Sequence, residues 1–217
     1  MIRFENLTKS FRVRGERKIV IDNQSIEFGA GRSIGLLGRN GAGKSTMLEL
    51  VAGTQRPDKG RIVRGGSVSW PVSLSSSFHR ELTGAQNIRF IARIYGVDTD
   101  ALVAFVEDFA ELGQHYYMPV RSYSQGMRAR LGFGASMGIR FDTYLVDEVT
   151  AVGDVSFKRK SEAVFRERMK HAGALVVSHS LSQIRSYCEE GVVLHQGQLF
   201  HFPDVEEAIA FYQSLMQ

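Results

Sequence analysis

The sequence predicts an α/β fold with a mostly parallel core sheet, an antiparallel β region at the N-terminus and an inserted helical lobe. Three observations support this fold class. Strand-like and helical segments alternate along much of the chain, which is typical of a parallel, twisted sheet. A glycine-rich run lies between a predicted strand and a predicted helix. Between about Leu82 and Ser122 the pattern becomes helical only.

The N-terminal third is predicted to be mainly β-structure. Its segments are rich in β-branched and aromatic residues, and turns at Gly15 and Gly29–Gly31 separate them. An apolar helix, Ser45–Val51, interrupts the strands and ends at Gly53. The predicted strands are Ile2–Leu7, Ile19–Phe28, Ser33–Leu37 and two short strands within Arg61–Trp70.

The middle of the chain has the spacing of amphipathic helices. Apolar residues recur three and four positions apart in two consecutive segments. Asp98 or Asp100 is expected to cap the second helix. The apolar faces are Ile88, Ile91, Ala92 and Tyr95 in the first helix, and Leu102, Phe105, Val106 and Phe109 in the second.

After Ser124 the alternation of strand and helix returns. Thr143–Val146 and Ala174–Val177 are predicted strands buried on both faces, with a long helix between them. A hairpin is expected over Val192–Phe202, around Gly197. The last predicted helix begins at Asp204, and its apolar face consists of Val205, Ile209 and Tyr212.

Composition excludes several classes of protein. The 217 residues contain one cysteine, Cys188, so an intrachain disulfide and a multi-cysteine metal site are excluded. No apolar run approaches the roughly 18–20 residues that cross a bilayer, and Met1–Glu5 lacks the apolar core of a signal peptide. If the protein acts at a membrane, a partner is expected to hold it there. The net charge is +4, but acids interleave the basic cluster at Lys158–Lys160 and no aromatic platform accompanies it, so nucleic acid is not an expected partner.

The strongest functional signal is Gly38-Arg39-Asn40-Gly41-Ala42-Gly43-Lys44-Ser45, followed by Thr46. It matches the pattern GxxxxGK[ST] in the strand–loop–helix context that this pattern requires. Phosphates approach such a loop closely, so side chains are absent and backbone N–H groups face the anion. Lys44 is predicted to reach the β- and γ-phosphates, and the Ser45 hydroxyl to ligate Mg²⁺. The predicted nucleotide contacts are Gly38, Asn40, Gly41, Ala42, Gly43, Lys44, Ser45 and Thr46.

A second signal is Tyr144-Leu145-Val146-Asp147-Glu148. An apolar strand here delivers an acid to its carboxyl end, where ligands of open α/β sheets bind. Asp147 is predicted to anchor the Mg²⁺ shell. Glu148 is predicted to polarise a water molecule against the γ-phosphate.

Two weaker signals gain meaning from their positions. Tyr123-Ser124-Gln125-Gly126-Met127 opens a predicted helix, Arg128–Ser136, so it provides a second anion site at a helix N-terminus. His179 ends a buried strand that is expected to neighbour the strand of Asp147, within reach of a γ-phosphate.

In this order, the four elements resemble the ABC ATPase domain over essentially the whole chain. The resemblance implies a single domain over residues 1–217, with 1–81 and 123–217 as catalytic core and 82–122 as helical lobe. It makes Ser124–Met127 the signature, His179 the switch histidine and Ala151–Asp154 the D-loop. Phe11 is the expected aromatic that stacks on adenine. The resemblance also implies ATP and Mg²⁺, and a head-to-tail dimer in which Lys44 of one copy and Ser124, Gln125 and Gly126 of the other hold the same ATP.

One departure concerns the glutamine that the family usually carries after the strand near Trp70. The sequence here is Trp70-Pro71-Val72-Ser73-Leu74-Ser75, which contains no glutamine. This role is therefore unassigned, with Ser73 as the nearest candidate. Ser69–Pro71, Phe78–Gly84, the Tyr-Ser-x-Gly-Met signature and Glu148–Asp154 resemble the polysaccharide-exporting subfamily, in particular its KpsT-type capsule-export ATPases. O-antigen relatives often carry a further carbohydrate-binding domain, whereas this chain ends at Gln217.

The resemblance implies partners and a location. A polytopic permease dimer is expected to receive the chain at the cytoplasmic face of the inner membrane, together with periplasmic and outer-membrane export proteins. The docking surface is expected at Ile88–Phe109 and Trp70–Phe78.

Three other classes of ATPase or kinase share parts of this pattern. A P-loop kinase of small molecules would have no use for Ser124–Met127 or His179. ATPases of DNA repair or translation generally carry a coiled-coil insertion or two tandem halves, and neither is found in this sequence. An ATPase of an O-antigen, teichoic-acid or drug exporter stays open, because its catalytic parts would be the same.

Overall fold

A computed structural model of the protein describes residues 1–13, 15–72, 78–147 and 155–216. The chain divides into two compact units. Unit 1 contains Met1–Pro71, Phe141–Val149 and Met169–Gln217, and unit 2 contains Val72–Arg140 and Thr150–Arg168.

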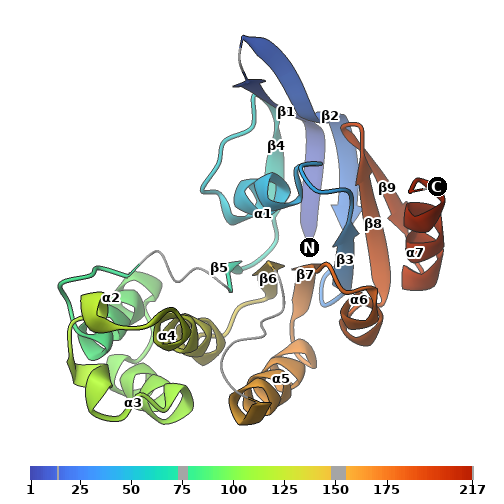
Figure 1. Cartoon of the computed structure of the whole chain (residues 1–217). Coiled ribbons are helices and arrows are strands. Elements are labelled where there is room, and N and C mark those ends of the chain that lie inside the picture. The colour runs from blue at the N-terminus through green and yellow to red at the C-terminus, as the bar shows by residue number, and fades with distance from the viewer. Residues whose placement is uncertain (14, 73–77, 148–154, 217) are drawn as a thin grey trace. The chain divides into compact units, whose positions relative to one another are not determined.

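Unit 1 contains a three-stranded antiparallel sheet in the order β2-β1-β4 (Figure 1). These strands are β1 (Ile2–Val13), β2 (Glu16–Phe28) and β4 (Lys59–Arg64). The predicted antiparallel β region is therefore confirmed. Its hairpin is longer than predicted and extends to Val13 and Glu16, which pair with each other. Cross-strand pairing holds these mostly polar strand ends together. They lack the alternation of apolar and polar residues from which a strand is predicted.

The second sheet of unit 1 has six strands in the order β5-β6-β7-β3-β8-β9. All neighbouring pairs are parallel except the β8–β9 hairpin. This confirms the predicted mostly parallel core sheet, and β3 matches its predicted bounds and is buried throughout. The strands are β3 (Ser33–Leu37), β5 (Val68–Pro71), β6 (Thr143–Asp147), β7 (Gly173–Val177), β8 (Glu190–His195) and β9 (Gln198–Phe202).

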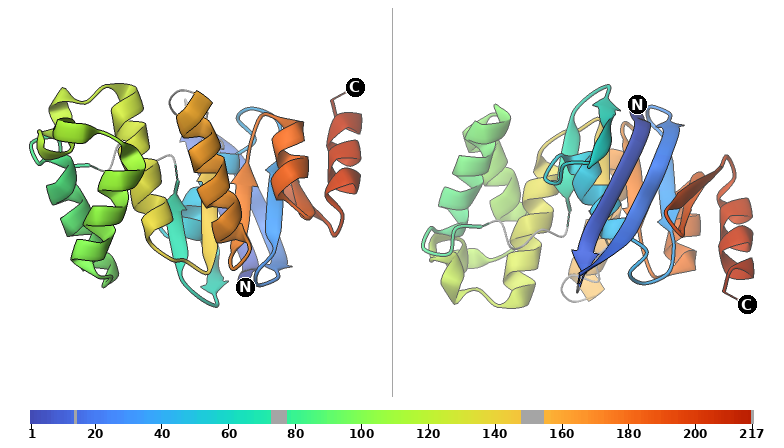
Figure 2. Two further views of the ribbon diagram at one scale, coloured as in Figure 1. Left: turned by 90° about the horizontal axis from the view of Figure 1, so that it is seen from below. Right: turned by 90° about the horizontal axis from the view of Figure 1, so that it is seen from above.

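Helix α1 (Lys44–Ala52) lies between the two sheets of unit 1 (Figure 2). It buries Met47, Leu48, Leu50 and Val51 in the core that both sheets share. Gly53 ends the helix in a left-handed conformation at φ 82°, as the sequence predicted. Burial against the apolar faces of both sheets thus fixes the position of the helix that follows the glycine-rich loop.

Two further helices complete unit 1. Helix α7 (Val205–Ser214) begins after Asp204, whose side chain accepts a hydrogen bond from the backbone N–H of Glu206. Val205 and Ile209 are buried, as predicted. Helix α6 (Leu181–Tyr187) was not predicted, because it is too short for a helical repeat to emerge.

Unit 2 is helical within its described residues. Thr83 and Gln86 form a reciprocal capping box at the start of α2, and Asp98, rather than Asp100, caps α3. Two short 3-10 helices between α3 and α4 were not predicted. The elements are α2 (Gly84–Tyr95), α3 (Thr99–Ala110), η2 (Gly113–Tyr117), η3 (Val120–Ser122), α4 (Gln125–Gly138) and α5 (Val155–Met169).

Aromatic packing joins α3, α4 and α5 in unit 2. The Phe109 ring stacks on Phe133 at 5.6 Å and meets Phe157 edge-on at 5.2 Å. Lys160 of α5 adds an ion pair with Glu111, with 2.7 Å between Nζ and Oε1. The residues predicted as a helical lobe, 82–122, lie within this unit, which also contains α4 and most of α5.

Candidate functional site

The glycine-rich loop joins the buried strand β3 to α1. Gly41 and Gly43 have φ angles of 76° and 114°, which L-residues rarely adopt. A Cβ atom on Gly43 would overlap the side chain of Val20 in β2. The glycine at position 43 therefore serves both the backbone conformation and the close approach of the loop to the antiparallel sheet.

Lys44, the first residue of α1, is buried within the loop. Its Nζ donates to the carbonyl oxygens of Gly38 at 2.7 Å and Arg39 at 3.2 Å. The helix N-cap is Gly43, which brings no side chain to the first-turn N–H groups. Ser45 is exposed beside them and Thr46 is partly buried. The arrangement offers an anion a lysine ammonium, backbone donors and a hydroxyl in one place.

Asp147 and His179 follow neighbouring strands. Asp147 ends β6 and pairs in register with Val177 of β7, two residues before His179. This confirms the prediction that the two strands are neighbours. Strand β3, which leads into the glycine-rich loop, pairs with β7 on its other side. Because carboxyl ends of parallel strands lie at the same sheet edge, Asp147, His179 and the loop all start from one edge.

Hydrogen bonds of the Ser178 side chain hold the turn that carries His179. Ser178 is buried, its hydroxyl donates to Oε1 of Gln183 at 2.7 Å and accepts from the backbone N–H of Ser180 at 3.0 Å. His179 itself is exposed. A fixed turn thus presents an exposed imidazole at the sheet edge.

Phe11 lies opposite Lys18 in the β1–β2 hairpin. Directly opposed residues of an antiparallel pair share a face. Lys18 reaches the loop from this face, because its Nζ donates to the carbonyl oxygen of Gly41 at 3.0 Å. The ring of Phe11, half-buried, therefore lies on the side of the hairpin that meets the loop. Sequence reasoning missed this contact of Lys18.

The predicted second anion site lies in unit 2, at the N-terminus of α4. Ser124 is the N-cap, and its hydroxyl accepts from the backbone N–H of Met127 at 3.2 Å. Ser124, Gln125 and Gly126 are exposed. Ser124 and Gly126 border a hollow of about 320 Å³, which is also lined by Glu111, Leu112, His115, Met127 and Arg130. The helix terminus is open, while the Ser124 hydroxyl also has an ordinary capping role.

Three predicted features lie outside the described residues. These are Glu148, the D-loop candidate Ala151–Asp154 and Ser73, the nearest substitute for the family's glutamine.

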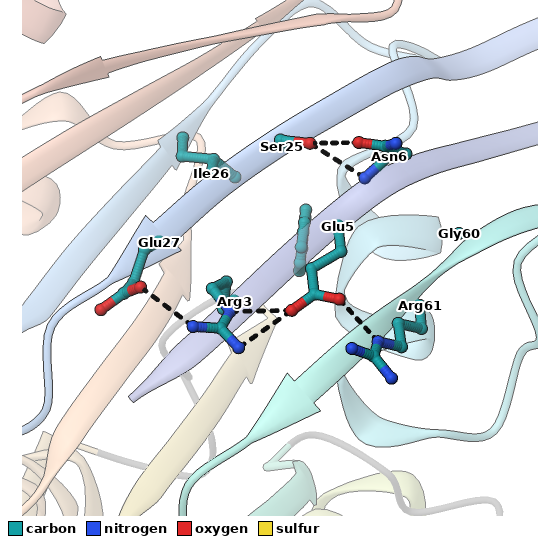
Figure 3. A pocket seen from close by; sticks show the side chains of 9 residues that line it. Arg3, Glu5, Asn6, Ser25, Ile26, Glu27, Gly60 and Arg61 are labelled. Carbon is teal, nitrogen blue, oxygen red and sulfur yellow. Dashed lines mark hydrogen bonds and ion pairs between the residues drawn. The ribbon is translucent and has the colours of Figure 1, made fainter.

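A larger hollow, of about 840 Å³, lies on the antiparallel sheet and includes none of the predicted site residues (Figure 3). Its charged side chains pair with one another. Arg3 lies between Glu5 and Glu27, at 2.9 Å and 3.9 Å, and Arg61 binds Glu5 at 2.6 Å. The charged side chains of this hollow neutralise one another, so it offers a ligand little net charge. The edge of the core sheet with Lys44, Asp147 and His179 is therefore the candidate site.

No helix within the described ranges is long and apolar enough to cross a membrane. In those ranges, no three His, Cys, Asp or Glu side chains gather in a way that could hold a metal ion.

Comparison with known proteins gives consistent matches. The sequence model described as ABC transporter matches residues 21–151. The chain is 45% identical to the polysialic acid transport ATP-binding protein KpsT of Escherichia coli, over 98% of this chain and 96% of KpsT. It is also 45% identical to the capsule polysaccharide export ATP-binding protein CtrD of Neisseria meningitidis serogroup B, over 99% of this chain and 100% of CtrD.

Two further similarities are more distant. The O-antigen export system ATP-binding protein RfbB of Klebsiella pneumoniae is 36% identical over 94% of this chain and 85% of RfbB. Among solved structures, the dimeric ATP-binding cassette MJ0796 bound to ADP and Pi aligns with a TM-score of 0.78 at 17% identity, over 93% of this chain and 98% of MJ0796. The last similarity confirms the fold class.

Proposed function

This chain belongs to the ABC transporter family and is an ABC ATPase, and we propose that it powers the export of a capsular polysaccharide through a separate permease. The observation that carries this proposal is the identity of 45% with KpsT and CtrD along nearly the full length of all three chains. The identity with the O-antigen protein RfbB is lower, at 36%, and covers less of that protein. The difference favours a capsule over an O-antigen as the exported polymer.

ATP binds with its phosphates against the glycine-rich loop. The bonds of Lys44 Nζ to the carbonyl oxygens of Gly38 and Arg39 hold the ammonium group at the loop before ATP arrives. When ATP binds, the ammonium group exchanges these bonds for the β- and γ-phosphate oxygens. The backbone N–H groups of Gly41 and Gly43–Thr46 face the same phosphates, whereas that of Ala42 donates to the carbonyl oxygen of Arg39 at 3.0 Å. Phe11 stacks on the adenine at the other end of the nucleotide.

The residues present fit a magnesium ion that accompanies the nucleotide. Mg²⁺ prefers oxygen ligands and usually takes only one or two from the protein, with the rest from phosphates and water. The exposed Ser45 hydroxyl and the Asp147 carboxylate, at neighbouring parts of one sheet edge, supply ligands of that kind. When bound, the ion neutralises charge on the phosphate oxygens.

Hydrolysis needs a residue that orients water and one that senses the γ-phosphate. Glu148 directly follows Asp147 in the sequence, and a carboxylate is the kind of group that orients or activates a water molecule for attack on the γ-phosphate. His179, held by the Ser178 turn, contacts the γ-phosphate. Glu148 is thus the general base or orienting group, and His179 couples the β7 end to the presence of ATP.

Two copies of the chain complete each site. The glycine-rich loop and the Ser124 helix terminus are both anion sites, and they belong to different units. In a head-to-tail dimer, Ser124, Gln125 and Gly126 of the second copy cover the γ-phosphate held by Lys44 of the first. Opening and closing of this dimer transmits the energy of ATP to the permease.

A pair of variants tests hydrolysis. Glu148→Gln should retain ATP binding while turnover falls roughly 100-fold or more, the scale of a lost general base. Lys44→Ala should instead lose ATP binding itself, because the phosphates lose their cation. Titration with ATP and measurement of phosphate release separate the two. Near-normal turnover in Glu148→Gln would remove that residue from catalysis.

The permease docks on unit 2. Phe90 and Ile94, one helical turn apart on α2, are 60% and 61% exposed. The opposite side of α2 buries Ile88 and Ala92, so Phe90 and Ile94 lie outside the packed side of the helix. Exposed apolar residues that gather on one surface mark sites of protein interaction. Through this contact the chain is held at the cytoplasmic face of the inner membrane, and periplasmic and outer-membrane proteins extend the export path.

Co-purification with tagged permeases tests the docking surface and the polymer class together. The wild-type chain should co-purify with a capsule-export permease and not with an O-antigen permease. Phe90→Glu combined with Ile94→Glu should abolish that association. Met216→Glu, which changes an exposed apolar residue beyond α7, is the matched control and should leave association intact. Loss of binding in the control, or retention in the α2 variant, would exclude this surface.

A further inference from the structure

A buried lysine contacts the ring assigned to adenine. Lys9 of β1 is 8% exposed, and its Nζ lies 5.0 Å from the centroid of the Phe11 ring. The same atom donates to the carbonyl oxygen of Arg56 at 2.8 Å and lies 3.5 Å from Oδ1 of Asp58. Three partners therefore surround this ammonium group, and one of them is an aromatic face.

Asp58 ties the same network to β1. Its Oδ2 accepts from the backbone N–H of Ser10 at 2.8 Å and from the Ser10 hydroxyl at 2.7 Å. Its own backbone N–H donates to the carbonyl oxygen of Thr8 at 2.8 Å. The Ser10 hydroxyl bond lowers the pKa of Asp58 below its usual value, so the carboxylate stays charged at neutral pH. The turn after α1 is thus bonded to the strand on both sides of Lys9.

Stability alone does not account for this lysine. Burying an ammonium group costs desolvation energy, and an apolar residue of similar volume often replaces a buried ion pair without loss of stability. A cation over an aromatic face, in contrast, attracts the ring and restricts where it lies. The contacts of Lys9 with Arg56 and Asp58 fix the cation, and the cation then fixes the ring.

The fixed ring faces the nucleotide loop. Phe11 pairs with Lys18, whose Nζ donates to the carbonyl oxygen of Gly41, and the ring is partly buried. A ring ordered before the ligand arrives binds it with a smaller loss of conformational freedom. Lys9 therefore orders the Phe11 ring at the position where the base stacks.

We propose that Lys9, anchored by Asp58 and the Arg56 carbonyl, is a positioning residue that holds Phe11 as the platform for the adenine base. The proposal rests on the proposed function, in which Phe11 stacks on ATP. The contacts of Lys9 are with the Phe11 ring, the Arg56 carbonyl and Asp58, so its effect reaches the nucleotide through the base.

Binding of two ligands by calorimetry tests the proposal. ATP engages both the loop and the ring, whereas inorganic tripolyphosphate engages only the loop. Lys9→Met should weaken ATP binding roughly threefold to twentyfold, the range of a cation–π contact, and leave tripolyphosphate binding unchanged. Lys9→Arg keeps a cation over the ring and should restore ATP affinity. Phe11→Ala should show the same selective loss, and adding Lys9→Met to it should cause no more.

Several results would overturn the proposal. Equal weakening of ATP and tripolyphosphate would mean that Lys9 supports the loop rather than the ring. Unchanged ATP affinity in Lys9→Met, or a further loss in the Phe11→Ala background, would also contradict it. If Lys9→Met does not fold, Asp58→Asn, which loosens the anchor from a partly exposed position, must show the same ligand-selective loss. A wild-type chain that binds tripolyphosphate but not ATP would instead refute the proposed function.

Discussion

Gly43→Ala tests how the glycine-rich loop is held. Alanine at φ 114° lies outside the regions that L-residues favour, which costs about 1–2 kcal/mol of unfolding free energy. Its Cβ would also overlap Val20, which is 4% exposed in β2 and cannot swing into solvent. Overpacking of this kind adds about 1–3 kcal/mol. Gly43→Ala should therefore lose about 2–5 kcal/mol in urea unfolding.

Gly31 provides the matched control. Its φ is 71°, and a Cβ there would meet nothing within 4 Å, so Gly31→Ala isolates backbone strain and should lose only about 1–2 kcal/mol. Val20→Ala should relieve the overlap, so the double variant with Gly43→Ala should lose about 1–3 kcal/mol less than the sum of the single variants. Equal losses at Gly43 and Gly31, or strict additivity with Val20→Ala, would refute the reasoning.

Three further predictions concern the shared site, the magnesium ligand and the buried cysteine. Mixing inactive Lys44→Ala with inactive Ser124→Arg should restore partial ATPase activity, because a heterodimer keeps one intact shared site; no recovery from isolated heterodimers would exclude shared sites. Asp147→Asn should leave magnesium-free ATP binding nearly unchanged and abolish its strengthening by Mg²⁺, as measured by calorimetry, whereas an intact magnesium effect would remove Asp147 from that role. Burial raises the pKa of the Cys188 thiol to about 12, so maleimide should label it slowly at neutral pH in the folded protein and quickly in denaturing urea; rapid labelling of the folded chain would contradict the buried position.

Local features of the fold were predictable from the sequence. Strand β3 and the stop of α1 at Gly53 were found because an apolar run and a glycine carry their own signals. The pairing of β6 with β7 followed from two buried apolar runs that each lead directly into polar residues. In contrast, the choice of Asp98 over Asp100 as helix cap depends on side-chain geometry that spacing cannot distinguish.

Contacts between distant segments were not predictable. The Lys9–Asp58 network joins residues far apart in the chain, and no local pattern in the sequence pairs them. Likewise, no motif marks Lys18, and the register of the hairpin brings it to Gly41. The phosphate site can be predicted from motifs because its residues are contiguous in the sequence. The residues that support the base come together only through tertiary contacts, so a motif does not mark them.

Rescue of polymer export in two hosts tests the central claim most directly. One host is an Escherichia coli strain that lacks KpsT, and the other is a Klebsiella pneumoniae strain that lacks RfbB. The wild-type chain should restore surface capsule in the first host and leave O-antigen export defective in the second, while Lys44→Ala should restore neither. Restoration of O-antigen without capsule, or capsule rescue by Lys44→Ala, would contradict a capsule exporter driven by ATP bound at this loop.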